Sequence, residues 1–165
     1  MKSNINILIT SVGRRTRLIE YFKREIDGTG KIVTADCSKL APALYLTEKH
    51  YIVPRIDDPN YIKVIKDICR EEKITAVLSL IDPELSLLAK HTEEFKKIGV
   101  STIVSSYQAC ELWLDKYATI SFYKENQYNF AKTYIDFFEF ADAIEKQKIH
   151  FPVFIKPRKG SASLN

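Results

Sequence analysis

Long hydrophobic runs are missing from this sequence of 165 residues. The longest apolar stretch, residues 74–81, is far shorter than the roughly 20 residues that a membrane-spanning helix needs. The amino terminus leads directly into a strand-like run, without the charged and apolar regions of an export signal. We therefore expect a cytoplasmic protein that does not enter a membrane.

Cysteine is also scarce. The three thiols, Cys37, Cys69 and Cys110, are widely spaced, and none belongs to a Cys-x-x-Cys pair or has a histidine pair nearby. This pattern argues against a zinc site and against a disulfide framework. We expect three reduced cysteines and no metal ligands among these residues.

Neither sign of charge dominates. Lysine and arginine number 25 against 21 acidic residues, so the formal net charge is +4, and basic residues are dispersed beside acidic ones. Nucleic-acid binding would call for a basic stripe or a recognisable module. The composition therefore predicts no nucleic-acid partner, while a small anionic ligand stays compatible with it.

The chain has only five glycines, and they do not form the patterns that bind nucleotides through a glycine-rich turn. The first strand is followed by a turn at residues 11–15 (SVGRR). This turn has a single glycine, Gly13, whereas the G-x-G-x-x-G pattern has three. NAD binding by a Rossmann-type enzyme is therefore disfavoured. The turn is either a tight connection with solvated arginines or a contact for an anion or substrate. Asp36, after the second strand, is either a loop residue or a ribose ligand.

Hydrophobic periodicity predicts strands that alternate with helices. Short apolar runs read as strands buried on both faces, whereas Leu18, Ile19, Phe22 and Ile26 mark one helical face that Gly28 terminates. The expected strands are 5–10, 32–35, 51–53, 76–81 and 101–104, with a short helix at 40–46. Five such strands predict a doubly wound α/β domain with a parallel sheet.

Two Asp-Pro pairs predict helix starts, because aspartate caps exposed N–H groups and proline suits the first helical turn. They lie at 58–59 and at 82–83, the second directly after a strand. Asp82 and Glu84 therefore have two readings, as residues that begin a helix or as contacts for a substrate at the ligand-binding edge of the sheet.

A second unit is expected after Val104. Ser105, Ser106 and Asp115 look like caps for helices at 107–113 and 116–126, followed by a strand at 131–135, a helix at 138–147 and a strand at 153–156. The sequence then stops in a turn-rich loop. From this we expect a truncated second domain.

The sharpest local signal lies at 156–163, where Lys-Pro-Arg-Lys-Gly-Ser-Ala-Ser follows an apolar strand-like run. Lys156 would direct a positive charge at one spot, and the small residues after it offer N–H and hydroxyl groups that can surround phosphate oxygens. The order G-x-x-x-x-G-K-[ST] of a Walker A loop is absent. A basic turn without a ligand is the simpler alternative.

This segment, behind a five-stranded α/β domain, resembles the ATP-grasp superfamily, in particular ligases similar to the carbamoyl-phosphate synthase large chain. Further matching stretches are residues 7–15 (ILITSVGRR), 35–38 (ADCS), 41–44 (APAL), 57–59 (DDP), 81–85 (IDPEL) and 115–117 (DKY). The resemblance implies a Rossmann-like pre-ATP-grasp domain at 1–105 and the beginning of an ATP-grasp α+β domain at 106–165.

The resemblance also implies which residues contact ATP. They are Lys116, Lys156, Gly160, Ser161, Ala162 and Ser163. Weaker candidates for substrate contacts are Gly13, Arg14, Asp82 and Glu84. Lys116 has an equally simple reading as a solvated lysine at a helix start.

ATP-grasp ligases phosphorylate a carboxylate with ATP and Mg²⁺, and an amine then displaces phosphate from the acyl phosphate. The resemblance therefore implies small-molecule carboxylate and amine substrates, with Mg²⁺ ligands beyond residue 165 and no turnover by this chain alone. A homodimer through apolar surface is a further expectation. The rival interpretation is a non-catalytic α/β binding module, or a split subunit that completes its site with a partner.

Overall fold

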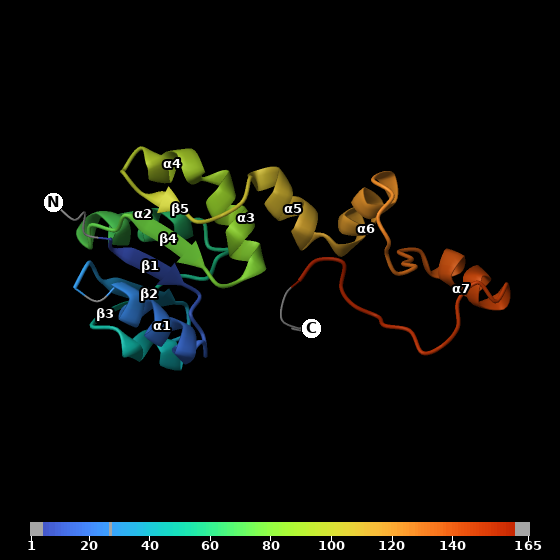
Figure 1. The fold of residues 1–165 in the computed structure, drawn as a ribbon, viewed down its shortest axis with the longest axis horizontal. Coiled ribbons are helices and arrows are strands. Elements are labelled where there is room, and N and C mark those ends of the chain that lie inside the picture. Colours follow the sequence, from blue (N-terminus) through green and yellow to red (C-terminus); the bar gives the residue numbers. More distant parts are fainter. Residues whose placement is uncertain (1–4, 27, 161–165) are drawn as a thin grey trace. The chain divides into compact units, whose positions relative to one another are not determined.

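A computed structural model describes residues 5–26 and 28–160 of the chain (Figure 1). The chain divides into two compact units, Met1–Cys110 and Glu111–Asn165. None of the helices in the described ranges is long and apolar enough to cross a membrane.

The first unit is built on a parallel sheet, which has five strands in the described part of the chain. Their order is β3-β2-β1-β4-β5, so β1 is central and pairs with β2 on one side and β4 on the other. Their bounds are β1 Ile7–Thr10, β2 Ile32–Asp36, β3 Lys49–Ile52, β4 Ala76–Ser79 and β5 Ser101–Thr102. The predicted parallel sheet is confirmed.

Helices cover both faces of this sheet, as Figure 1 shows. Leu8 of β1 packs in one core with residues of α2, α3 and α4, while the next residue, Ile9, packs in a second core with residues of α1 and η1. Successive side chains of a strand point to opposite faces, so one apolar run contributes to both cores. The helix bounds are α1 Thr16–Ile26, η1 Pro42–Leu46, α2 Tyr61–Glu71, α3 Asp82–Lys90 and α4 Thr92–Lys96.

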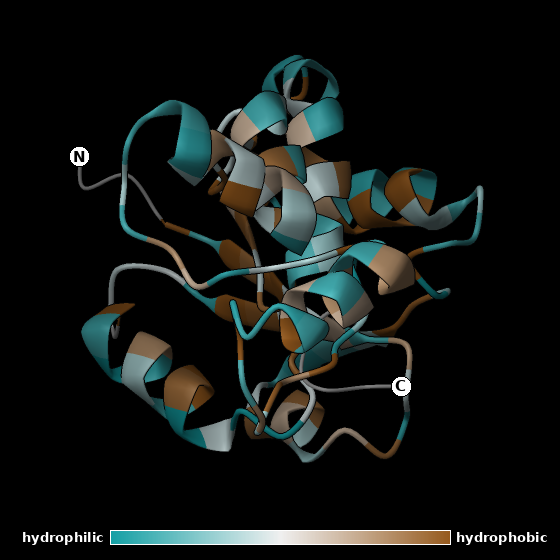
Figure 2. Cartoon of the chain, turned by 90° about the vertical axis from the view of Figure 1, so that its right-hand side faces the viewer, coloured by the Kyte–Doolittle hydropathy of each residue, from teal (hydrophilic) through white to brown (hydrophobic). Residues whose placement is uncertain are grey.

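Hydropathy follows this layering. Figure 2 shows hydrophobic residues on the strands and an alternation of hydrophobic and hydrophilic residues along the helices. Each helix therefore buries one face against the sheet and exposes the other. The doubly wound α/β architecture follows from this pattern.

Both Asp-Pro helix starts differ in detail from the prediction. Asp58 accepts the N–H of Asn60 at 2.7 Å in the turn before α2, which begins at Tyr61. Asp82 is the first residue of α3 and not its cap, because Ile81 holds the extended conformation of the N-cap position. Acidic side chains in the first helical turn still interact favourably with the helix dipole.

Helix caps further along the chain are confirmed. The Ser106 hydroxyl accepts the N–H of Ala109 at 3.2 Å at the start of α5 (Tyr107–Leu114). Asp115 accepts the N–H groups of Tyr117 and Ala118 at 3.0 and 3.1 Å at the start of α6 (Lys116–Glu125). The last helix, α7, spans Phe137–Glu145.

The strands expected at 131–135 and 153–156 are wrong for the part of the chain that the structure describes, where neither segment joins a sheet. Phe154 and Ile155 are 98% and 94% exposed. A strand is stable only when a neighbour satisfies its backbone groups and covers its apolar face. The apolar residues of these segments therefore did not suffice to form strands.

Candidate functional site

Two groups of residues match the candidates from the sequence, one in each unit. The first lies at the carboxyl edge of the sheet, in the turn between β1 and α1. Ser11 and Gly13 both have left-handed backbones, with φ of 50° and 51°. Glycine adopts this conformation without strain, which explains the single glycine of the turn.

Asp36, at the end of β2, occupies the anion-binding position of this turn. Its carboxylate accepts the N–H of Gly13 and the N–H of Ser38, each at 2.8 Å, and its side chain is buried with the core. The Gly13 N–H is thus already bonded to a protein carboxylate, which leaves it unavailable to a dinucleotide pyrophosphate. This geometry favours the loop role for Asp36 over a ribose contact.

Glu84 forms the centre of a buried polar network. Its carboxylate accepts hydroxyl hydrogen bonds from Ser11 at 2.6 Å, from Ser79 at 2.7 Å and from Tyr61. Glu84 is fully buried. The network joins the β1–α1 turn, β4, α2 and α3. In this structure the Glu84 carboxylate therefore holds these elements together and is not free to contact a substrate.

Tyr61 remains a hydroxyl donor in this network across the physiological pH range. Burial raises the pKa of its phenol far above the ordinary value, and the neighbouring Glu84 carboxylate raises it further. A neutral phenol beside a carboxylate is the stable pairing, because two buried negative charges would repel each other.

The other weak candidates lie at the surface. Arg14 and Asp82 are exposed and Gly13 is half-buried, all near the carboxyl ends of the strands. Arg15 donates to the Ser11 carbonyl at 3.2 Å and so borders the same turn. This edge combines a left-handed turn with arginines that can meet an anionic group of a ligand.

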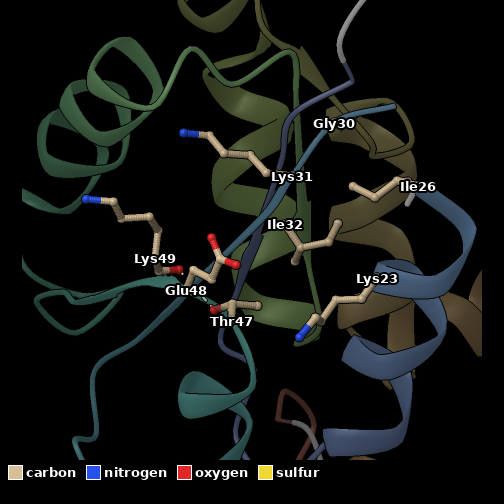
Figure 3. Close-up of a pocket in the computed structure, with 8 residues that line it drawn as sticks. All are labelled: Lys23, Ile26, Gly30, Lys31, Ile32, Thr47, Glu48 and Lys49. Atoms are coloured by element: carbon tan, nitrogen blue, oxygen red, sulfur yellow. Dashed lines mark hydrogen bonds between the residues drawn. The ribbon is translucent and has the colours of Figure 1, made fainter. Parts of the chain in front are cut away.

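A cavity of about 210 Å³ lies elsewhere, at the amino ends of β2 and β3 (Figure 3). Three of its lining residues are lysines, but Lys23 donates to the Leu46 carbonyl at 2.6 Å and Lys31 pairs with Glu72. In Figure 3 the Lys31 and Lys49 side chains point away from Lys23. The charged groups that line this cavity therefore do not converge on one ligand.

The second candidate group lies in the Glu111–Asn165 unit. Lys116, the first residue of α6, donates from Nζ to the Gly160 carbonyl at 3.0 Å. Arg158 forms a bidentate ion pair with Asp115, the cap of the same helix. Gly160 has φ of 140°, a backbone conformation that favours glycine. Two of the residues expected to contact ATP are thus brought together.

The remaining phosphate candidates are only partly described. Lys156 is exposed, whereas Ser161, Ala162 and Ser163 lie outside the described residues. Within the described ranges, no group of three or more His, Cys, Asp or Glu side chains is arranged to hold a metal ion.

Sequence reasoning missed how two of these side chains act. It assigned Asp115 only as a helix cap and Arg158 only as part of a basic loop, although they are 43 positions apart and directly paired. It also missed that hydroxyls from three separate elements converge on Glu84. For the Asp115–Arg158 pair, the only local signal was that Lys116 directly follows a capping aspartate.

Comparison with known proteins decides the family. Residues 7–103 match the family described as "PylC-like, N-terminal domain", and this match spans more than half of the chain. The chain belongs to this family. The PylC-like domain thus coincides with the five-stranded sheet and its helices. A search of curated proteins found no sequence match.

Solved structures share the fold of the PylC-like chain at low sequence identity. N5-carboxyaminoimidazole synthetase from Staphylococcus aureus, complexed with ADP, has a TM-score of 0.65 and 17% identity over 98% of this chain and 40% of its own. For L-amino acid ligase from Bacillus licheniformis these values are 0.62, 17%, 90% and 43%. For the biotin carboxylase domain of the Hydrogenobacter thermophilus 2-oxoglutarate carboxylase, with MgADP and bicarbonate, they are 0.60, 17%, 94% and 35%.

This chain therefore spans about two fifths of the length of such enzymes. The predicted resemblance to the N-terminal part of an ATP-grasp ligase is confirmed at the level of family and fold.

Proposed function

We propose that this chain supplies the N-terminal domain and the beginning of the ATP-binding domain, residues 106–165, of an ATP-dependent carboxylate–amine ligase. One observation carries the proposal. In a PylC-like chain, Lys116 and Gly160 meet at 3.0 Å although 44 positions separate them. These are residues that the ATP-grasp resemblance assigns to ATP, and they come from its two separate motifs.

The chemistry of this group suits the phosphates of a nucleotide. Arg158 and Lys159 are paired with carboxylates of Asp115 and Glu111, whereas Lys116 contacts a neutral carbonyl and keeps its charge. Positioned lysines offset the negative charge of a transferring phosphoryl group. In the proposed site Lys116 and Lys156 contact the phosphates, and residues 160–163 close over them.

The proposed reaction is the one that the ATP-grasp resemblance implies. The terminal phosphoryl group of ATP passes to a carboxylate oxygen of the substrate, ADP leaves, and an amine then attacks the carbonyl carbon and expels phosphate. The described residues do not form a set of acidic donors for Mg²⁺. We propose that the Mg²⁺ and adenine contacts come from residues outside this chain, and that the 165 residues alone do not turn over.

Substrate contacts are proposed at the carboxyl edge of the sheet. Arg14 and Asp82 are exposed there, and Gly13 shapes the turn between them and the sheet. An arginine suits a substrate carboxylate, and an aspartate suits an amine. Glu84 supports this edge from inside. A closer relation to the carbamoyl-phosphate synthase large chain, and a cytoplasmic location, stay predictions from the sequence.

Phosphate release tests the proposal directly. The enzyme assayed joins this chain with the remaining ATP-grasp residues, as encoded downstream in the same gene or in a neighbouring one. It is incubated with Mg-ATP and a panel of amino acids and small carboxylates. The Lys156→Ala variant is compared with Lys146→Ala, which removes the same charge from an exposed pair on α7.

Release that requires a particular carboxylate, vanishes in Lys156→Ala and persists in Lys146→Ala would establish the ligase and its substrate class. Phosphate release that no carboxylate stimulates, or that is unchanged in Lys156→Ala, would overturn the proposal. The 165-residue chain assayed alone should release no phosphate.

A split subunit is the second candidate, and the exposure of apolar residues in the Glu111–Asn165 unit favours it. Phe137, Phe138, Phe154 and Ile155 are all more than 70% exposed, and such surface is typical of an interface. The downstream DNA separates the two cases, because an in-frame continuation indicates one ligase chain and a separate gene indicates a partner. A homodimer through the same surface would appear as a concentration-dependent mass in light scattering.

A further inference from the structure

Among the described residues of the Glu111–Asn165 unit, Asp115 and Arg158 form the ion pair with the most contacts between its charged atoms. Arg158 Nε lies 2.8 Å from both carboxylate oxygens of Asp115, and Nη2 lies 2.7 Å from Oδ2. The Asp115 side chain is only 9% exposed. Bidentate guanidinium–carboxylate pairs fix orientation as well as distance, because the planar fork accepts only one geometry.

The segments that carry these two residues are also joined through the backbone. Lys116 donates its N–H to the Arg158 carbonyl at 3.0 Å, and Asp115 and Lys159 form an antiparallel bridge. Asp115 Oδ1 also accepts the first N–H groups of α6. One carboxylate thus holds the start of a helix and the loop at 158–160 in a single arrangement.

Lys116 lies at the centre of this arrangement. It directly follows Asp115, its N–H is held by Arg158, and its ammonium reaches the Gly160 carbonyl at 3.0 Å. An ammonium has three donors, so contact with one carbonyl leaves others for a second acceptor. The Lys116 charge is therefore directed at the loop without being neutralised by it.

We propose that Asp115 and Arg158 act as a positioning pair that holds Lys116 and the 158–160 loop in the geometry for a nucleotide phosphate. This inference rests on the proposed function and names residues that position the phosphate contact without touching the ligand. Arg158, although basic and beside the loop, is committed to Asp115. The positive charge that meets the phosphate is that of Lys116.

Electrostatics keeps the pair intact at neutral pH. The Arg158 guanidinium holds the pKa of the Asp115 carboxyl well below its usual range, and the N–H groups of α6 lower it further. Asp115 in turn raises the pKa of Arg158. The pair therefore positions Lys116 throughout the pH range in which a nucleotide is fully ionised.

Nucleotide binding by the ligase described above tests the inference, with ATP and adenosine titrated in parallel. Arg158→Lys keeps the charge and loses the planar fork, and Asp115→Asn keeps a good helix cap and loses the ion pair. Losing a positioned contact to a charged phosphate should weaken ATP binding roughly 10- to 100-fold. Adenosine binding should not change in either variant. Lys146→Ala should bind both ligands as the wild type does.

A double-mutant cycle separates positioning from a direct role. In a Lys116→Ala background, Arg158→Lys should cost no further ATP affinity, because the pair acts through Lys116. Additive losses would overturn the inference, as would equal losses of ATP and adenosine in either single variant. The far-ultraviolet circular dichroism spectrum of each variant, compared with that of the wild type, reports whether it is folded.

Failure of the underlying proposal gives a different result. A wild-type ligase that binds no ATP would overturn the proposed function and the positioning role together. A wild type that binds ATP, with Arg158→Lys and Asp115→Asn binding it equally well, would overturn only the positioning role.

Discussion

Removing one hydroxyl from the buried Glu84 network should destabilise the protein measurably. Tyr61→Phe deletes the phenol oxygen and leaves the ring in place, so it creates no large cavity. Glu84 would keep its hydrogen bonds from Ser11 and Ser79, at 2.6 and 2.7 Å, and lose the third. The change therefore removes the buried hydrogen bond to the carboxylate, together with the contact between the phenol and the Thr10 hydroxyl.

The expected magnitude follows from the charge and burial of the acceptor. Hydrogen bonds to charged groups contribute about 1.5–3 kcal/mol to stability. Glu84 is fully buried, so water does not replace the lost donor. We expect a free energy of unfolding lower by about 2 kcal/mol. For a urea slope of about 2 kcal/mol/M the midpoint would fall by about 1 M.

Urea unfolding followed by far-ultraviolet circular dichroism measures this midpoint. Tyr21→Phe is the matched control, because it deletes the same atom from a half-exposed ring on α1. A Tyr61→Phe midpoint within about 0.2 M of the control, well inside the usual uncertainty of such stabilities, would refute the reasoning. Glu84 would then not depend on its hydroxyl partners for burial.

Three smaller predictions concern other parts of the first unit. Lys66 and His91 lower the pKa of Glu94 to about 2 through their hydrogen bonds, and Lys66 contributes most. These interactions stabilise the fold above pH 4.5 and the effect is lost as pH falls toward 2, so Lys66→Ala should raise the Glu94 pKa, measured by NMR titration, part of the way toward 4.5. Burial raises the pKa of Cys69 to about 12, so at pH 8 a thiol reagent should label exposed Cys37 quickly and Cys69 only after unfolding. Gly30→Ala should lower the melting temperature strongly, because a Cβ there would lie 1.9 Å from a backbone carbonyl oxygen.

Each of these predictions has a contrary result. A Glu94 pKa that is the same in Lys66→Ala as in the wild type would mean that the ion pair does not persist in solution. Rapid labelling of Cys69 in the folded protein would show that its core opens readily. A Gly30→Ala variant with the melting temperature of the wild type would contradict the described backbone packing.

Much of the fold was open to prediction from local sequence signals. The apolar run ending at Thr10 predicted the central strand, and its consecutive residues Leu8 and Ile9 pack in opposite cores. Asp115 was predicted as a helix cap and is one. These signals act between residues a few positions apart, so reading them does not require the three-dimensional arrangement.

Strands in the Glu111–Asn165 unit were predicted wrongly for a physical reason. The apolar run at 153–156 describes what a strand would bury, but a strand also needs a neighbour for its backbone. Within the described residues that neighbour does not form, and Phe154 and Ile155 are exposed. Local pattern alone cannot decide whether a partner strand is present.

The sequence by itself determined the order of elements in the first unit, the parallel sheet and the two lysine-containing motifs of the candidate nucleotide site. Only the tertiary structure decided that Glu84 is buried among three hydroxyl donors and that Arg158 forms an ion pair with Asp115. These contacts join residues 73 and 43 positions apart. Their geometry depends on how whole elements pack, because a charged side chain takes its role from the groups that surround it after folding.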